Sequence, residues 1–205
     1  MNTPYLLLLV AVFWVTIVVS QKNPPPLPTE YYCNVIQRKW NHNGYGVNHT
    51  ESSTSYSSYS LGYYRFDTAA IESNFTATSG NVGNLASSLN DYTGKVFPTP
   101  IDTFVEISNV GQVPTCTVYN STWPPPLPAN GLSLLGAIYS GTREIPYYGQ
   151  VDQWTVVENK AAATFWFSGG LIVGYQFDTN NSDQGQVGVV TFMFNLVEGT
   201  FSEFL

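Results

Sequence analysis

Few residues of this chain have the type and spacing needed for catalysis. The two histidines, His42 and His49, both lie in a polar segment rich in glycine, serine and tyrosine, whereas a Ser-His-Asp hydrolase needs a histidine held by a structured neighbour. The run GLSLLG at 131–136 resembles a nucleophile elbow, but its second glycine has the wrong spacing. No HExxH, phosphate-binding loop or dinucleotide fingerprint occurs. The sequence therefore favours a protein that is not an enzyme, with an unrecognised hydrolase as an alternative.

Acidic residues are the other candidates for chemistry. Four glutamates could be considered for the carboxylate pair of a glycosidase, but they stand on unrelated segments, and surface carboxylates are far commoner. They are Glu72, Glu106, Glu144 and Glu158. The stretch DTNNSD at 178–183 resembles a calcium loop in composition only, because it lacks the glycine and the distal glutamate of an EF-hand. We expect no catalytic residue, no metal site and no cofactor, with calcium left open.

The N-terminus has the pattern of a secretory signal peptide. Its apolar run of about 15 residues, YLLLLVAVFWVTIVV at 5–19, is shorter than the roughly 20 residues that span a bilayer. Small residues near the end of this run predict cleavage before Gln21, so that residues 1–20 are removed. An uncleaved N-terminal anchor is the alternative. No later stretch approaches membrane length, so we expect a secreted protein that is not integral to a membrane.

Sequons and composition agree with secretion. The low share of charged residues (10%) and the many aromatic residues (15%) suit a surface made soluble by glycans. A net charge of −7 argues against nucleic acid as a partner, because phosphate binding needs clustered lysine and arginine. Glycans require exposed asparagines, so the sequons predict loops or outward faces. The predicted glycosylation sites are Asn48, Asn74, Asn120 and Asn180.

The chain has two cysteines, Cys33 and Cys116. In a secreted chain an even number of cysteines predicts disulfides, so we expect a Cys33–Cys116 bridge. Two buried free thiols are the alternative. Metal binding is less favoured, because neither cysteine has a further cysteine or histidine at ligand spacing.

The hydrophobic pattern predicts an antiparallel β protein with little helix. Alternating or aromatic-rich runs indicate strands, and the turn-like runs ENK at 158–160 and SGG at 168–170 separate three of them. The expected strands are 61–67, 104–108, 116–119, 151–157, 162–167 and 171–177, with a last pair within 186–196. Residues 131–138 are the only candidate for a short helix. The polar stretch 41–60 is expected to be a long loop or an irregular hairpin, and 79–94 is a tract rich in glycine, asparagine and serine.

Aromatic side chains concentrate in the C-terminal strands. Alternation places Phe165 and Phe167 on one face and Trp166 on the other. It likewise groups 171, 173, 175 and 177 on one face, and 192, 194 and 196 on another. These rings could form an ordinary core, or they could line a curved sheet face that holds an apolar ligand.

Three motifs, in order, resemble the ependymin-related proteins. They are YYRFD at 63–67, TCTVYNSTWPPPLP at 115–128 and VDQW at 151–154, and the similarity covers most of residues 31–205. The resemblance implies a partly open β-barrel of two stacked curved sheets around a hydrophobic pocket, similar in shape to bacterial lipoprotein carriers. It also implies a secreted or lysosomal glycoprotein that binds lipid, often as a homodimer, with calcium association. The chain has fewer cysteines than the vertebrate members and no cysteine-containing tail, so their disulfides are not transferred.

These observations combine into one hypothesis. The chain is expected to comprise a signal peptide (1–20), a proline-rich extended segment (21–30) and a single β domain (31–205). That domain would bind a lipid or another apolar molecule, or else serve as a matrix or cell-adhesion glycoprotein. The predicted ligand-binding residues are Tyr64, Phe66, Trp154, Phe165, Phe167, Tyr175 and Phe177.

Overall fold

The computed structural model describes residues 22–40, 49–71, 85–93, 101–107, 115–120, 125–158, 161–179 and 188–199. These residues form one antiparallel sheet of eleven strands, in the order β6-β5-β4-β3-β2-β1-β11-β10-β9-β8-β7. The strands are β1 (Glu30–Trp40), β2 (His49–Ser58), β3 (Tyr63–Ile71), β4 (Leu85–Asp91), β5 (Ile101–Ile107), β6 (Thr115–Asn120), β7 (Ile138–Ile145), β8 (Gly149–Glu158), β9 (Ala161–Ser168), β10 (Leu171–Thr179) and β11 (Gly188–Glu198).

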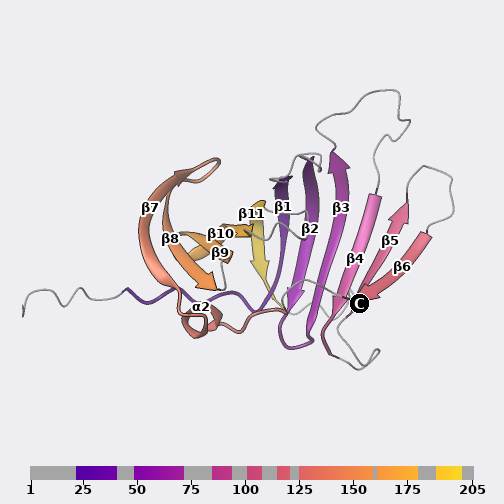
Figure 1. Ribbon diagram of the computed structural model, residues 1–205, viewed down its shortest axis with the longest axis horizontal. Coiled ribbons are helices and arrows are strands. Elements are labelled where there is room, and N and C mark those ends of the chain that lie inside the picture. The colour runs from indigo at the N-terminus through magenta and orange to yellow at the C-terminus, as the bar shows by residue number, and fades with distance from the viewer. Residues whose placement is uncertain are drawn as a thin grey trace, which may run out of the picture.

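The sheet is curved and open. Strands β1–β6 lie side by side, while β7–β10 curl away from them and arch round, so that the two halves face each other (Figure 1). Among the described strands β6 and β7 are the edges, and they do not pair with one another. The predicted mainly β, partly open barrel is confirmed. Its two curved sheets are the two halves of one continuous sheet.

The strands expected from hydrophobic alternation are present. The turn between β9 and β10 contains Gly169 and Gly170, both with positive φ (59° and 87°). A two-residue hairpin turn that follows the twist of its strands requires positive φ at both positions, which favours glycine. The C-terminal pair expected within 186–196 is instead the single strand β11, paired with β1 and β10.

Four strands were not predicted. β2 fills half of the stretch 41–60, which is expected to be a loop or irregular hairpin, β4 lies in the tract rich in glycine, asparagine and serine, and β1 and β7 have no counterpart among the expected strands. β2 is flanked on both sides along its length, by β1 and by β3. Such a ladder supplies hydrogen bonds and packing that outweigh a weak local preference for strand. Of the two alternatives, a loop is therefore wrong for 49–58, because these residues form a strand that pairs antiparallel with the preceding β1.

A bulge in β10 changes which face of the sheet its side chains occupy. The pairing of β9 with β10 shifts register between Ile172 and Gly174, and a bulge moves the following side chains to the other face. Ile172 consequently belongs to the same core cluster as Phe165, whereas Val173 packs with Trp166 on the opposite face. Gly174 is required here because a Cβ would lie 2.4 Å from the backbone oxygen of Thr191. The predicted common face of 171, 173, 175 and 177 is thus broken.

The helix is shorter than expected. Residues 131–138 were the candidate, but α2 covers only Gly131–Leu134 and β7 begins at Ile138. Gly136, with φ of 67°, ends the turn in the left-handed region that glycine favours. Within the described residues, no helix has the length and apolar character needed to cross a bilayer.

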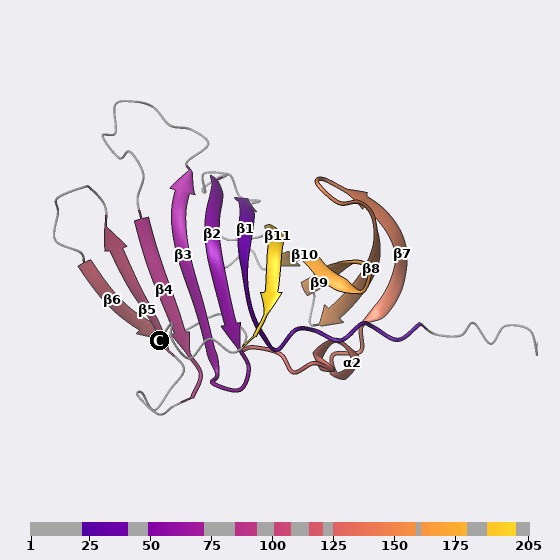
Figure 2. The same cartoon turned by 180° about the vertical axis from the view of Figure 1, so that it is seen from behind.

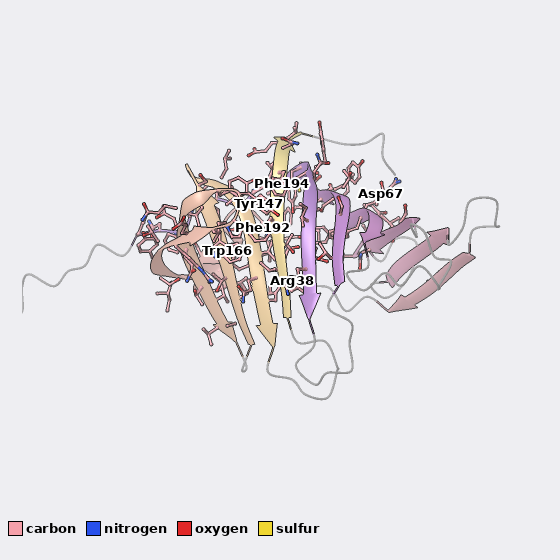
Figure 3. All side chains as sticks on the ribbon, turned by 90° about the horizontal axis from the view of Figure 1, so that it is seen from above. Arg38, Asp67, Tyr147, Trp166, Phe192 and Phe194 are labelled. Atoms are coloured by element: carbon pink, nitrogen blue, oxygen red, sulfur yellow. The ribbon has the colours of Figure 1, made fainter. Side chains whose placement is uncertain are left out.

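Core side chains cover both faces of the curled half. On the concave face, Trp154 and Phe167 are almost fully buried, at 0% and 1% exposed. On the convex face, Trp166 stacks on Phe192 at 5.9 Å between ring centroids. The turn between β7 and β8 folds over this convex face, where Tyr147 contacts the rings of Phe192 and Phe194 (Figure 3). The predicted split of Phe165 and Phe167 from Trp166 is confirmed.

The expected disulfide is not formed. Cys33 is a buried free cysteine on β1, and Cys116 pairs through its backbone with Val105 on β6. Four strands, β2–β5, separate β1 from β6, and neighbouring strands are about 4.8 Å apart. A disulfide needs Cα atoms within about 7 Å, so the strand order excludes this bridge.

The sequons lie mostly outside the described residues. Asn48, Asn74 and Asn180 are in that category, as is the predicted signal peptide. Asn120 is the last residue of the edge strand β6, opposite Ile101. Glycosylation therefore stays a prediction.

Candidate functional site

A cavity of about 500 Å³ lies between the two halves of the sheet. Its size falls in the range of ligand pockets, roughly 300–1,000 Å³. One wall comes from β1–β3, and the other comes from β8–β11. The lining is mainly aliphatic and aromatic, with a few hydroxyl groups and one thiol. It includes Leu27, Tyr31, Cys33, Val35, Ser55, Ser57, Tyr64, Phe66, Leu127, Leu135, Val156, Ala163, Phe165, Ile172, Tyr175, Phe177 and Met193.

Strand register places small residues in the middle of the first wall. Ser57 lies between Tyr31 and Tyr64 across β1–β3, and in the next row Ser55 lies between Cys33 and Phe66. Alternate residues of a strand share a face, so both serines point toward the cavity. Their side chains fill far less space than the tyrosines and phenylalanines beside them. The serine-rich sequence of β2 is typical of a loop, but in the sheet its small side chains help to leave the cavity open.

Aromatic rings form the second wall. Phe165 on β9 lies 6.4 Å from Tyr175 and 6.2 Å from Phe177 on β10, measured between ring centroids. Tyr175 and Phe177 are 5.1 Å apart. Such tilted and edge-on contacts are favourable for aromatic pairs. They fix the rings as a surface against which an apolar molecule can pack.

Two proline-rich segments close one end of the cavity. The sequence PPPLP occurs twice, at 24–28 and 124–128, and both copies reach the cavity through Leu27 and Leu127. The backbone N–H of Leu27 donates to the oxygen of Ala129 at 2.9 Å, which ties the two segments together. Figure 2 shows the N-terminal segment running past α2 at this end of the sheet. Neither proline run was assigned to the site from sequence, although the repeat was a signal that could have linked them.

An ion pair anchors the first of these segments. Lys22 Nζ donates to a carboxylate oxygen of Asp152 on β8 at 2.7 Å and lies 4.5 Å from the ring centre of Tyr139 on β7. The Tyr139 hydroxyl donates to the other carboxylate oxygen of Asp152 at 2.9 Å. These hydrogen bonds, that of Lys22 first, lower the pKa of Asp152. Because the pair is exposed, its contribution to stability is small, and its effect is to fix where the segment starts.

Five of the seven predicted ligand-binding residues line the cavity: Tyr64, Phe66, Phe165, Tyr175 and Phe177. The other two, Trp154 and Phe167, lie on the same concave face but are buried in the core behind it. Trp154 packs against Tyr139, with ring centroids 5.2 Å apart. The alternation of residues along β8 and β9 correctly puts Trp154 and Phe167 on the face that bears the cavity. Both, however, lie at points along their strands where the core fills that face, outside the cavity lining.

The polar groups of the cavity are neutral at ordinary pH. Burial raises the pKa of Tyr31, of Tyr64 and of Tyr175, and hydrogen bonds to Ser57 or Thr191 offset only part of this effect. Burial also raises the pKa of the Cys33 thiol to about 12. A protonated, buried thiol is a poor nucleophile. Cys33 therefore acts as a small apolar surface in the wall.

Alkaline pH should destabilise the fold through these groups. In the unfolded chain they ionise at their ordinary pKa values, whereas the folded protein retains their protons to higher pH. Below an ordinary value of 9.0 for the thiol, both states are protonated and stability is level; the free energy of unfolding then falls as the pH rises toward 12. Urea unfolding at successive pH values measures this. Tyr175→Phe should show a shallower fall, and a level profile through this range would contradict the burial of these groups.

No metal site is found in the part of the chain that the structure describes, since no three histidine, cysteine, aspartate or glutamate side chains converge there. Most of the calcium-like stretch, 180–183, lies outside that part. The same is true of His42. Calcium association therefore stays a prediction.

Comparison with known proteins identifies no family. No family model matches the chain, and no curated protein matches it. Among solved structures, a β-barrel-like protein of a domain of unknown function from Brucella abortus is similar over 83% of this chain and 98% of its own, with 10% identity and a TM-score of 0.35. At that TM-score the similarity supports no argument about function, so the cavity must be interpreted from its own residues.

Proposed function

We propose that this chain is an extracellular carrier or receptor that binds a lipid or another apolar small molecule between the two halves of its sheet. The observation that supports this most is the cavity of about 500 Å³ with its mainly apolar lining. A cavity of this kind costs stability unless something occupies it, because its walls lose packing contacts. Burying apolar ligand surface would supply the affinity. No catalytic role is part of the proposal.

Secretion, glycosylation and homodimer formation belong to the same proposal. They rest on the signal-peptide pattern, the sequons and the resemblance to ependymin-related proteins. Calcium association rests on the resemblance and on the composition of residues 178–183.

Titration with an environment-sensitive apolar fluorophore tests the proposal. The delipidated protein should enhance the fluorescence with saturation at one probe per chain, and a long-chain lipid should displace the probe. Because burial of aliphatic surface is worth about 25 cal/mol per Å², a cavity-sized ligand should bind with micromolar or better affinity. Absence of saturable enhancement, together with no displacement, would contradict the proposal.

A matrix or adhesion glycoprotein is the second candidate. The convex face favours it, because the exposed Tyr147 (68% exposed) packs edge-on against Phe192 and Phe194 there. Adhesion through this face would be lost in Tyr147→Ser and kept in variants that fill the cavity. The cavity, which adhesion does not require, supports the carrier function over adhesion.

A further inference from the structure

The described cavity lining contains no charged side chain. Its polar atoms are hydroxyl groups of tyrosines and serines together with the Cys33 thiol. The ion pairs Lys22–Asp152 and Arg65–Asp67 are both formed by residues that do not line the cavity. A ligand that enters the cavity therefore meets hydrogen-bonding groups but no formal charge.

The hydroxyl groups cluster at one place. Tyr31, Ser57 and Tyr64 stand in one row across β1–β3, and all three line the cavity. The Tyr175 phenol, from the opposite wall, is near enough to both tyrosines to raise their pKa values further. Hydroxyl groups both donate and accept hydrogen bonds. The cluster can thus satisfy one polar, uncharged group of a ligand.

An anionic head group would fit this cluster poorly. Burying a carboxylate or phosphate costs several kcal/mol unless a cation or several strong donors compensate it. Neutral phenols and a serine supply donors but no cation. A hydroxyl, ester or ketone group would bury without that cost, because each needs only one or two hydrogen bonds.

On the basis of the proposed function, we infer that the ligand is a neutral lipid whose uncharged oxygen is bound by the Tyr31–Ser57–Tyr64 cluster. Long-chain alcohols, sterols and esters belong to this class. A fatty acid would enter the cavity in its protonated form. Its affinity should therefore fall as the pH rises above the carboxyl pKa, while the affinity of the matching alcohol stays level until the tyrosines and Cys33 ionise. The titratable groups that face the site are Tyr31 and Cys33 from β1, Tyr64 from β3 and Tyr175 from β10.

A matched pair of ligands tests this inference. A long-chain alcohol and the fatty acid of equal chain length would each compete with a bound apolar fluorophore at about pH 8 and about pH 4, either side of the ordinary carboxyl pKa of about 4.3. We expect the alcohol to bind at least about tenfold more tightly at the higher pH and the difference to shrink at the lower one.

Variants of the cluster add a second readout. Tyr64→Phe keeps the ring and removes the hydroxyl, so it should weaken alcohol binding about fivefold and leave binding of the corresponding alkane unchanged. Equal or tighter binding of the acid at the higher pH, or no effect of Tyr64→Phe on the alcohol, would overturn the inference while the carrier function stands. Failure of alcohol, acid and alkane alike would overturn the proposed function itself.

Discussion

Ala163→Trp is expected to lower the affinity for an apolar fluorophore by at least about tenfold. The new indole would displace an area of ligand about the size of one ring, and burial of that area is worth more than about 1.4 kcal/mol of binding free energy. Ala163 lines the cavity from β9, next to Phe177 on β10 and Val156 on β8. An indole at this position would occupy the space that the ligand needs. Fluorescence titration of the delipidated protein measures the change.

The matched control is Val157→Trp. Val157 follows Val156 on β8, is 74% exposed and does not line the cavity, so the same enlargement should leave affinity unchanged. Ser55→Leu narrows the cavity from the opposite wall and should weaken binding to a smaller degree. If both cavity variants stay folded by circular dichroism and bind as well as the unchanged chain, the ligand does not occupy this cavity.

Trp154→Ala is expected to produce the largest loss of stability, about 3–5 kcal/mol in the free energy of unfolding. Trp154 has 0% exposure, packs against Tyr139 and belongs to the concave core cluster. Removing its indole leaves a void within the curled half, where β8 pairs with β7 on one side and β9 on the other. Urea denaturation followed by circular dichroism measures the change.

The exposed Val157 again provides the comparison, and Val157→Ala should change the free energy of unfolding by no more than about 0.5 kcal/mol. A loss below about 1 kcal/mol for Trp154→Ala would be smaller than the removal of a buried indole allows, even where the surrounding side chains partly fill the space. It would then contradict the assignment of Trp154 to the core and return it to the cavity wall.

The C-terminal strands could be predicted because their sequence carries strong local signals. β8, β9 and β10 are rich in apolar and aromatic residues, and glycines such as Gly169 and Gly170 mark the turn between β9 and β10. β2 could not be found in this way, because its serines give no hydrophobic alternation. It is a strand because β1 and β3 flank it, and that information is not local.

The candidate site was predictable to the extent that aromatic residues alternate. This pattern correctly predicts five residues of the cavity lining. Trp154 and Phe167 lie on the same face but belong to the core and not to the lining. Depth along a strand does not follow from alternation, which reports only the face. Leu27 and Leu127 reach the site through contacts between segments 100 residues apart.

The cysteine pairing failed for a related reason. Counting cysteines assumes that Cys33 and Cys116 can meet, whereas the strand order separates their strands by four others. Strand order depends on pairings between distant segments. The distance between the two cysteines therefore cannot be predicted from the segments around them, because it depends on the order of all the strands between β1 and β6.

Native mass spectrometry of the protein from a eukaryotic secretory host, combined with lipid extraction, tests the carrier function most directly. The protein is expected to carry close to one lipid per chain, and the extract should be dominated by molecules with an uncharged head group. Ala163→Trp should carry far less. A chain that is free of lipid as purified, and that takes up none from a panel of neutral and anionic lipids, would contradict the carrier function.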